Sequence, residues 1–216
     1  MLYDDFMNLK NMRRIGLMGG TFDPIHQGHL VTAETARSEF NLEKVIFVPS
    51  GQPPHKKGLK ISNKEARYLM TVLATSENPY FEVSRFELDR SGESYAIETV
   101  KYFHSRMAPE SALYFITGAD AILEIVTWKN VEGLFDCCTF IAATRPGYDL
   151  GALKKKLLKK LSPAHLEKII PLEVPAMAIS STDIRHKIKK GKTIKYLLPA
   201  EVESFIYKNN LYSPWV

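Results

Sequence analysis

Apolar residues in this chain gather in short continuous runs that alternate with longer segments in which they recur every three or four positions. Short runs are typical of strands buried on both faces, and the longer spacing is typical of amphipathic helices. The predicted strands are residues 15–18, 45–49, 81–88, 112–117, 137–143 and 169–174. The predicted helices are residues 30–40, 63–76, 95–106, 121–126, 149–161, 182–190 and 200–209.

Strands that alternate with helices favour a parallel sheet covered by helices on both faces. We therefore predict a Rossmann-like, doubly wound α/β fold, in which ligands bind beyond the carboxyl ends of the strands. The helices after residue 181 are expected to form a C-terminal helical cap on the sheet. A length of 216 residues suits one domain, predicted to span residues 12–216. Residues 1–11 are predicted to be a leader outside the fold, and the sequence leaves open whether Met1 or Met12 is the natural start.

The most informative segment is residues 19–29, which read Gly-Gly-Thr-Phe-Asp-Pro-Ile-His-Gln-Gly-His between the first predicted strand and the first predicted helix. Gly19 and Gly20 are expected to form a turn that lets the main chain approach a bulky anion. If the helix begins directly after His26, then His26 and His29 project toward one side, near N–H groups that favour negative charge. The segment predicts a site that handles phosphate groups.

A second segment, residues 179–185, reads Ile-Ser-Ser-Thr-Asp-Ile-Arg and lies about 150 residues after the first. Ser180, Ser181 or Thr182 can cap the following helix, which leaves N–H groups at its start facing outward. Arg185 lies roughly one turn inside that helix. An anion fits here as well, so the chain has a predicted phosphate-binding segment near each end.

The composition favours a globular protein with anionic partners. Hydrophobic residues make up 45% of the chain and charged residues 25%, and no apolar run is long enough to cross a bilayer. The net charge is +5, with basic residues concentrated in residues 154–160 and 185–195. Nucleotides, nucleic acid and plain solubility would all suit this charge.

The two cysteines, Cys137 and Cys138, are adjacent in a predicted strand. Neighbouring strand residues point to opposite faces, so we expect reduced thiols and neither a disulfide nor a metal site. The first residues lack the apolar core of a signal peptide, and the predicted location is cytoplasmic.

Residues 19–29 resemble the histidine-x-glycine-histidine signature of the nucleotidyltransferase superfamily, and residues 179–185 resemble its second signature. Together with four shorter segments, they make the chain from Arg13 onward similar to bacterial nicotinate mononucleotide adenylyltransferases. The shorter segments, in chain order, are Pro53-Pro54-His55-Lys56, Gly118-Ala119-Asp120, Thr127-Trp128 and Arg145-Pro146-Gly147.

The resemblance implies transfer of AMP from ATP to nicotinate mononucleotide, which gives nicotinate adenine dinucleotide and pyrophosphate in NAD biosynthesis. The attacking phosphate is already an anion, so the protein need only align the reactants and stabilise charge on the leaving pyrophosphate. The implied catalytic residues are His26, His29, Lys56 and Arg185. The implied ATP-binding residues are Gly19, Gly20, Thr21, Phe22, Gly118, Asp120, Arg145, Ile179, Ser180 and Ser181.

The same resemblance implies a mononucleotide site made of Ser94, Tyr95, Ala96, Thr127 and Trp128. Trp128 would stack on the pyridine ring. The family often has threonine where this chain has Ala96, so a hydroxyl contact from that position is absent. Mg²⁺ is implied as the cofactor, bound mainly through the ATP phosphates because this ion keeps most of its waters, and no protein ligand is assigned to it.

The sequence leaves other acceptors open. Phosphopantetheine is disfavoured by the Pro-Pro-His-Lys segment and Thr127-Trp128, whereas nicotinamide mononucleotide differs from the acid by one charge that the sequence cannot test. A basic RNA-binding or regulatory protein is disfavoured because aromatic residues do not interleave with the lysine run. The expected partners are ATP and nicotinate mononucleotide, with neither nucleic acid nor membrane. The sequence does not decide between a monomer and a homo-oligomer.

Overall fold

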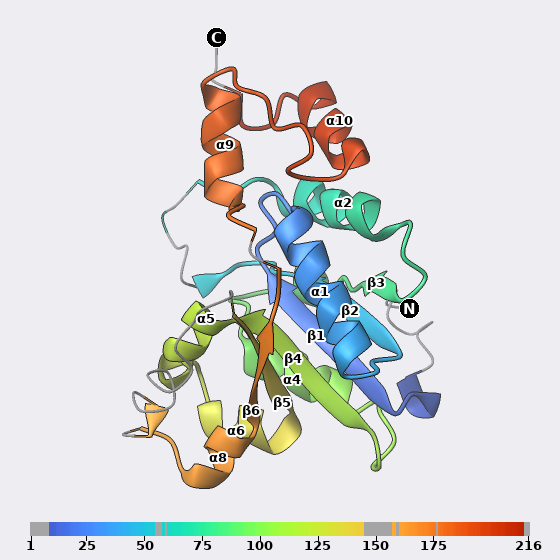
Figure 1. Cartoon of the computed structure of the whole chain (residues 1–216), viewed down its shortest axis with the longest axis vertical. Helices are drawn as coiled ribbons and strands as arrows, with labels where there is room; N and C mark the ends of the chain where they lie inside the picture. The colour runs from blue at the N-terminus through green and yellow to red at the C-terminus, as the bar shows by residue number, and fades with distance from the viewer. Residues whose placement is uncertain are drawn as a thin grey trace.

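The computed structural model describes residues 9–54, 58, 60–144, 157–158, 160–175 and 177–213. These residues form a six-stranded parallel sheet in the order β3-β2-β1-β4-β5-β6 (Figure 1). The strands are β1 (Arg14–Gly20), β2 (Lys44–Pro49), β3 (Phe81–Val83), β4 (Ala112–Gly118), β5 (Thr139–Thr144) and β6 (Ile169–Glu173). The predicted Rossmann-like, doubly wound fold is confirmed.

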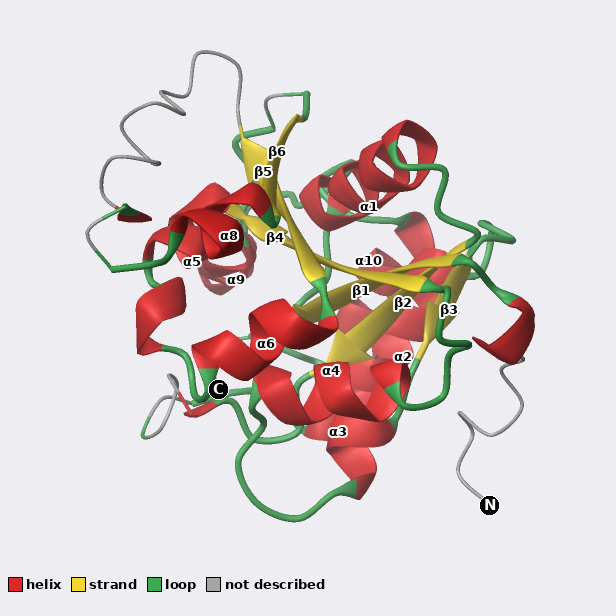
Figure 2. Ribbon diagram, turned by 90° about the horizontal axis from the view of Figure 1, so that it is seen from below, coloured by secondary structure: helices red, strands yellow, loops and turns green. Residues whose placement is uncertain are grey.

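Helices cover both faces of the sheet, with α1 on one face and α4 and α6 on the other (Figure 2). The α-helices in the described residues are α1 (Gln27–Glu39), α2 (Lys64–Thr75), α3 (Phe86–Asp89), α4 (Ala96–His104), α5 (Ala119–Leu123), α6 (Val131–Cys137), α8 (Pro163–Glu167), α9 (Ser181–Lys189) and α10 (Ala200–Lys208). Short 3-10 helices are η2 (Leu9–Asn11) and η4 (Ile125–Thr127). Across these helices we find none with the length and apolar character that a bilayer crossing requires.

Alternate residues along the strands enter two separate cores. Leu17 and its neighbours pack against α4 and α6, whereas Met18 packs in the core beneath α1, α2, α9 and α10. Ile184 of α9 and Val202 of α10 are fully buried in that second core. The C-terminal helices thus share their core with the sheet and form the predicted cap, which Figure 1 shows beside α2 at one end of the molecule.

The predicted strand 81–88 is wrong over its second half. β3 ends at Val83, and the chain turns into α3 because the buried Ser84 hydroxyl accepts a hydrogen bond from the Phe86 N–H (3.0 Å). This local contact gives the backbone a partner outside the sheet.

The strand predicted from residue 137 begins two residues later. Cys137 ends α6, Cys138 is the C-cap of that helix, and β5 starts at Thr139. Both cysteines are free, and burial raises the pKa of the Cys138 thiol. The helix predicted at residues 149–161 lies mostly outside the described residues.

The predicted leader overlaps the folded region. Leu9 is only 3% exposed and belongs to the core beneath α4 and α6. Leu9 thus packs with the fold although it was predicted to belong to the leader, and residues 1–8 lie outside the description.

Candidate active site

Two pockets open beyond the carboxyl ends of β1 and β4, the neighbouring strands at which the strand order reverses direction. This is where doubly wound sheets bind ligands. The first pocket has a volume of about 580 Å³ and the second about 320 Å³. Gly19 and Thr117 line both pockets, so the two cavities meet at the strand ends.

Gly19 and Gly20 do not form the predicted turn. They are the last two residues of β1, paired with Val48 and Pro49 of β2, and neither has a positive φ. The turn comes later, at Phe22, whose φ is 49°. A Cβ on Gly20 would lie 2.7 Å from the Phe22 ring, so glycine is required here by close packing.

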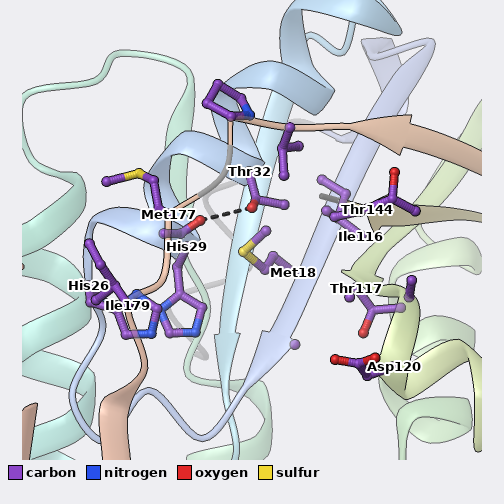
Figure 3. A pocket seen from close by; sticks show the side chains of 17 residues that line it. Met18, His26, His29, Thr32, Ile116, Thr117, Asp120, Thr144, Met177 and Ile179 are labelled. Carbon is purple, nitrogen blue, oxygen red and sulfur yellow. Dashed lines mark hydrogen bonds between the residues drawn. The ribbon is translucent and has the colours of Figure 1, made fainter. Parts of the chain in front are cut away.

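The two signature histidines lie at the start of α1, as predicted. His26 is the N-cap, and its backbone N–H donates to Nδ1 of His29 (3.2 Å). The two rings stack with centroids 3.8 Å apart. Because Nδ1 of neutral His29 accepts this bond, its proton belongs on Nε2, which makes Nε2 a donor. Both side chains line the first pocket (Figure 3).

Burial makes both histidines neutral at pH 7. It lowers the pKa of His26 to about 4, and burial together with repulsion from His26 lowers the pKa of His29 to about 3. At pH 7 the site therefore presents both imidazoles in their neutral form. Negative charge brought by a ligand would favour their protonated forms.

Mild acid is expected to destabilise the fold through this pair. An unfolded histidine has a pKa near 6.5, so between about pH 6.5 and 4 the unfolded state binds more protons than the folded state. The contribution of this pair to the free energy of unfolding is therefore fully present above pH 6.5. It decreases as the pH falls, by up to about 1.4 kcal/mol per pH unit for each histidine. Urea unfolding between pH 7 and 5 measures this slope. His26→Asn retains an N-cap and should flatten the slope, and an unchanged slope would contradict the assignment.

The second signature segment contacts the first across most of the sequence. The Ser181 hydroxyl donates to the Pro24 carbonyl (2.8 Å), and Nη1 of Arg185 donates to the Asp23 carbonyl (2.7 Å). These bonds join residues 157 and 162 positions apart. Ser180 caps α9 by accepting from the backbone N–H three residues later (3.1 Å). The two segments therefore form one connected structure.

The opposite wall of the first pocket comes from the end of β4 and the start of α5. Gly118 is the N-cap of α5, and Asp120 lies in its first turn. Figure 3 shows Thr117 and Asp120 across the pocket from His26 and His29. The pocket thus has imidazole donors on one side and a carboxylate acceptor on the other.

The second pocket contains all five residues of the predicted mononucleotide site, namely Ser94, Tyr95, Ala96, Thr127 and Trp128. The half-buried Trp128 ring packs edge-on against Phe115 (centroids 5.8 Å apart) and Phe140 (6.2 Å), which fixes its orientation. Lys129 adds a positive charge to the wall, 4.0 Å from the Tyr95 ring centroid.

Other predicted residues lie elsewhere. Gly20 and Thr21 line the second pocket, although ATP contacts were expected of them. Phe22 is buried, with its ring edge-on to His29 (5.1 Å). Lys56 and Arg145 lie outside the described residues.

Arg185 and the two serines are near the first pocket without forming its wall. Of the second signature segment, all of which is described, only Ile179 lines that pocket. Arg185, Ser180 and Ser181 instead fix the start of α9 and its contact with the 23–24 peptide. No group of three or more His, Cys, Asp and Glu side chains able to hold a metal ion occurs in the described ranges.

Sequence reasoning missed several wall residues. Thr117 is the penultimate residue of β4 and Thr144 is the last residue of β5, and both line the first pocket. Glu87 and Lys129 line the second pocket. The strand-end position was a usable signal for the threonines, because ligands of this fold bind there. Glu87 was not identified because it falls in residues 81–88, which were predicted to form a strand.

Sequence comparison relates the chain to known proteins over most of its length. The family model described as Cytidylyltransferase-like matches residues 17–187. A protein of Moorella thermoacetica named probable nicotinate-nucleotide adenylyltransferase is 60% identical over 201 residues, which cover 93% of this chain and 92% of that protein. A protein of the same name from Thermoanaerobacter sp. (strain X514) is 55% identical, over 92% of this chain and 94% of that protein. Another, from Corynebacterium glutamicum, is 45% identical, over 95% of this chain and 91% of that protein.

Solved structures share the fold. Plasmodium falciparum nicotinic acid mononucleotide adenylyltransferase, solved in complex with APC and with NaAD, aligns with TM-scores of 0.70 and 0.71. Both alignments cover 93% of this chain and 97% of that protein, at 21% sequence identity. At that identity the likeness extends to the fold alone.

Proposed function

The chain belongs to the cytidylyltransferase-like family, and we propose that it is a nicotinate-nucleotide adenylyltransferase, which transfers AMP from ATP to nicotinate mononucleotide. The observation that carries the proposal is the junction of two pockets at Gly19 and Thr117. A dinucleotide product needs two nucleoside sites whose phosphates meet. Relatives that are 45–60% identical over nearly the whole chain carry the same functional name.

ATP is assigned to the first pocket. In this proposal the Asp120 carboxylate accepts hydrogen bonds from the ribose hydroxyls and Ile179 contacts the adenosine, because both residues line this pocket. The triphosphate would lie at the start of α1, where Nε2 of His29 donates to it. Not every N–H there is free, because that of Gln27 donates to the Leu197 carbonyl (3.0 Å). Lys56, Arg145 and Arg185 remain assigned to the phosphates and adenosine as predictions.

Nicotinate mononucleotide is assigned to the second pocket, with its pyridine ring on Trp128. α4 begins at Ala96, which lines this pocket, and its N-cap Tyr95 makes no side-chain capping bond, so the first N–H groups of the helix are left for a ligand. A carboxylate is a suitable acceptor for those groups. Recognition through the backbone would make the missing hydroxyl at Ala96 unimportant.

The charges around the second pocket favour the acid over the amide. Lys129, whose ammonium also pairs with Glu98 (3.4 Å), attracts a carboxylate more strongly than a neutral amide. Glu87 also lines the pocket, but burial raises its pKa and disfavours its charged form. We therefore infer that nicotinate mononucleotide is preferred to nicotinamide mononucleotide.

The proposed reaction is a direct displacement. A phosphate oxygen of the mononucleotide attacks the α-phosphorus of ATP, and the bond from that phosphorus to the bridging oxygen breaks to release pyrophosphate. No proton needs to be removed from the nucleophile, so the histidines serve as donors to the phosphate oxygens. Mg²⁺ would supply additional positive charge to the triphosphate. It would be held mainly by the phosphate oxygens and its own waters, which fits described residues that contain no group of three or more His, Cys, Asp and Glu side chains able to hold an ion.

Product identification tests the proposal. Purified protein is incubated with ATP, Mg²⁺ and either nicotinate mononucleotide, nicotinamide mononucleotide or phosphopantetheine, and the products are identified by mass. We expect nicotinate adenine dinucleotide and pyrophosphate in equal amounts, and a kcat/KM for the amide lower by at least about 10-fold. Preference for phosphopantetheine, or salt-sensitive RNA binding without pyrophosphate release, would reject it. The cytoplasm is the proposed location.

A further inference from the structure

Arg67 is a charged side chain in the protein interior, where charge is costly. It lies in α2 and is 1% exposed. Its guanidinium donates to three backbone carbonyls: Nε to Ser62 (3.1 Å), Nη1 to Thr21 (2.7 Å) and Nη2 to Gly51 (3.3 Å). A charged donor makes stronger hydrogen bonds than a neutral one, and each of these bonds replaces water lost on burial.

The carbonyls belong to segments that border the proposed reaction site. Thr21 directly follows β1 and lines the second pocket. Gly51 follows β2 and is adjacent to Ser50, which lines the same pocket. Arg67 therefore links the ends of two neighbouring strands beside the proposed mononucleotide pocket.

Gly51 is also held from its other side. The Ser94 hydroxyl accepts hydrogen bonds from the N–H groups of Gly51 (3.0 Å) and Gln52 (3.1 Å). A Cβ on Gly51 would lie 2.1 Å from the Glu87 carbonyl oxygen, so another residue does not fit without displacement. The Gly51 peptide is thus fixed between Arg67 and a residue of the mononucleotide pocket.

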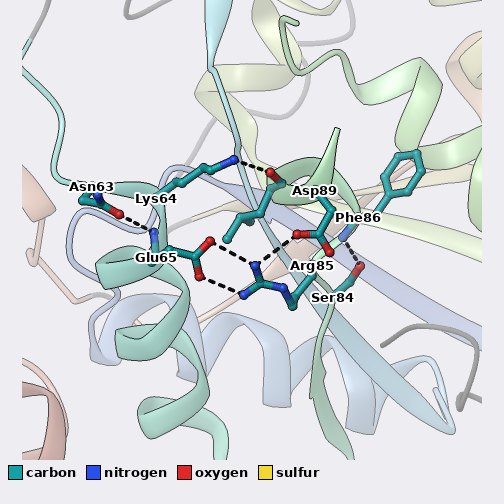
Figure 4. A network of polar contacts seen from close by, with 8 residues as sticks. Asn63, Lys64, Glu65, Ser84, Arg85, Phe86 and Asp89 are labelled. Carbon is teal, nitrogen blue, oxygen red and sulfur yellow. Dashed lines mark hydrogen bonds and ion pairs between the residues drawn. The ribbon is translucent and has the colours of Figure 1, made fainter. Parts of the chain in front are cut away.

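The helix that carries Arg67 is itself anchored near that pocket. Arg85 binds both carboxylate oxygens of Glu65 (2.9 and 3.0 Å) and one of Asp89 (3.0 Å), which ties the first turn of α2 to α3 (Figure 4). Lys64 donates to the Leu88 carbonyl (2.5 Å). Arg67 therefore projects from a helix whose position is well determined.

We infer that Arg67 is a positioning residue, which holds Thr21 and Gly51 in register so that the mononucleotide phosphate meets the α-phosphorus of ATP. This inference rests on the proposed function. Arg67 acts through the backbone and need not touch either substrate. A small misalignment of reacting atoms costs on the order of 10²-fold in rate. Lysine retains the charge, but its three N–H groups share one nitrogen and cannot reach three carbonyls that Nε, Nη1 and Nη2 contact from separate positions.

Arg67→Lys tests the inference, with Thr71→Val as its matched control. Thr71 lies one turn further along α2, is fully buried, and donates to the Arg67 carbonyl within the helix (2.8 Å). We expect Arg67→Lys to lower kcat by about 10²-fold while the calorimetric Kd of each substrate changes by less than about 3-fold. Thr71→Val should lower the thermal midpoint and preserve kcat. Retained kcat in Arg67→Lys, or an equal loss in Thr71→Val, would overturn the inference.

Chemical rescue separates positioning from folding if Arg67→Lys is poorly folded. Arg67 lines a surface pocket of about 560 Å³, so added methylguanidine can reach the space left in Arg67→Gly. Turnover should return with methylguanidine and not with methylamine, and equal responses to both would overturn the inference. Absence of product with the wild-type protein would instead count against the proposed function.

Discussion

His29→Ala is expected to lower kcat by on the order of 10³-fold while the protein remains folded. The imidazole is fixed by the bond from the His26 N–H to its Nδ1, by stacking on His26 and by the Phe22 edge. This arrangement directs the Nε2 donor at the charge that develops on the phosphates. One such pre-aimed donor commonly contributes 10²- to 10³-fold, and loss of its positioning effect adds to this. Steady-state kinetics of pyrophosphate release measure the change, and kcat within 10-fold of wild type would exclude the role.

Two conservative replacements separate catalysis from capping at this position. Asn places its amide oxygen close to the position of Nδ1 and can accept the His26 N–H, so His29→Asn should retain stability and lose turnover. Gln at the same position can also accept that N–H, or can present an amide donor close to the Nε2 position, so His29→Gln should recover part of the rate at a similar thermal midpoint. If kcat decreased in parallel with the thermal midpoint across the Ala, Asn and Gln variants, the role of His29 would be structural and not catalytic.

Trp128→Ala is expected to weaken binding of nicotinate mononucleotide by about 10²-fold and leave ATP binding unchanged. Burying one face of a ring and stacking it contribute about 2–3 kcal/mol, and 1.4 kcal/mol corresponds to a tenfold change in Kd. ATP is assigned to the other pocket, whose wall does not include Trp128 in the described residues. Isothermal titration calorimetry with each substrate alone measures both affinities.

Trp128→Phe is the matched control, because phenylalanine keeps a flat ring packed against Phe115 and Phe140. It should weaken mononucleotide binding by less than about 10-fold. Loss of ATP affinity in Trp128→Ala, with mononucleotide affinity retained, would reverse the assignment of the two pockets.

Continuous buried runs bounded by turn residues were predictable from the sequence. The runs of β1, β2 and β4 appear at their predicted positions, and α1 starts directly after His26, three residues before the predicted helix 30–40. The sequence also predicted that the two signature segments lie close together, and the hydrogen bond from Arg185 to the Asp23 carbonyl joins them. All residues predicted to bind the mononucleotide line one pocket.

What sequence reasoning missed depends on single tertiary contacts. β3 is short because one hydroxyl, that of Ser84, turns the chain into α3. Arg67 resembles any polar residue of an amphipathic helix, and its burial depends on carbonyls from loops far along the chain. The neutral state of His26 and His29 is likewise a consequence of burial, which composition does not reveal.

A crystal structure of the protein with nicotinate adenine dinucleotide tests the central claim most directly, because the product should extend across both pockets. We predict adenosine within hydrogen-bonding distance of Asp120, the diphosphate beside Gly19 and His29, and the pyridine ring stacked on Trp128. A dinucleotide confined to one pocket, or bound with its adenine on Trp128, would contradict the account.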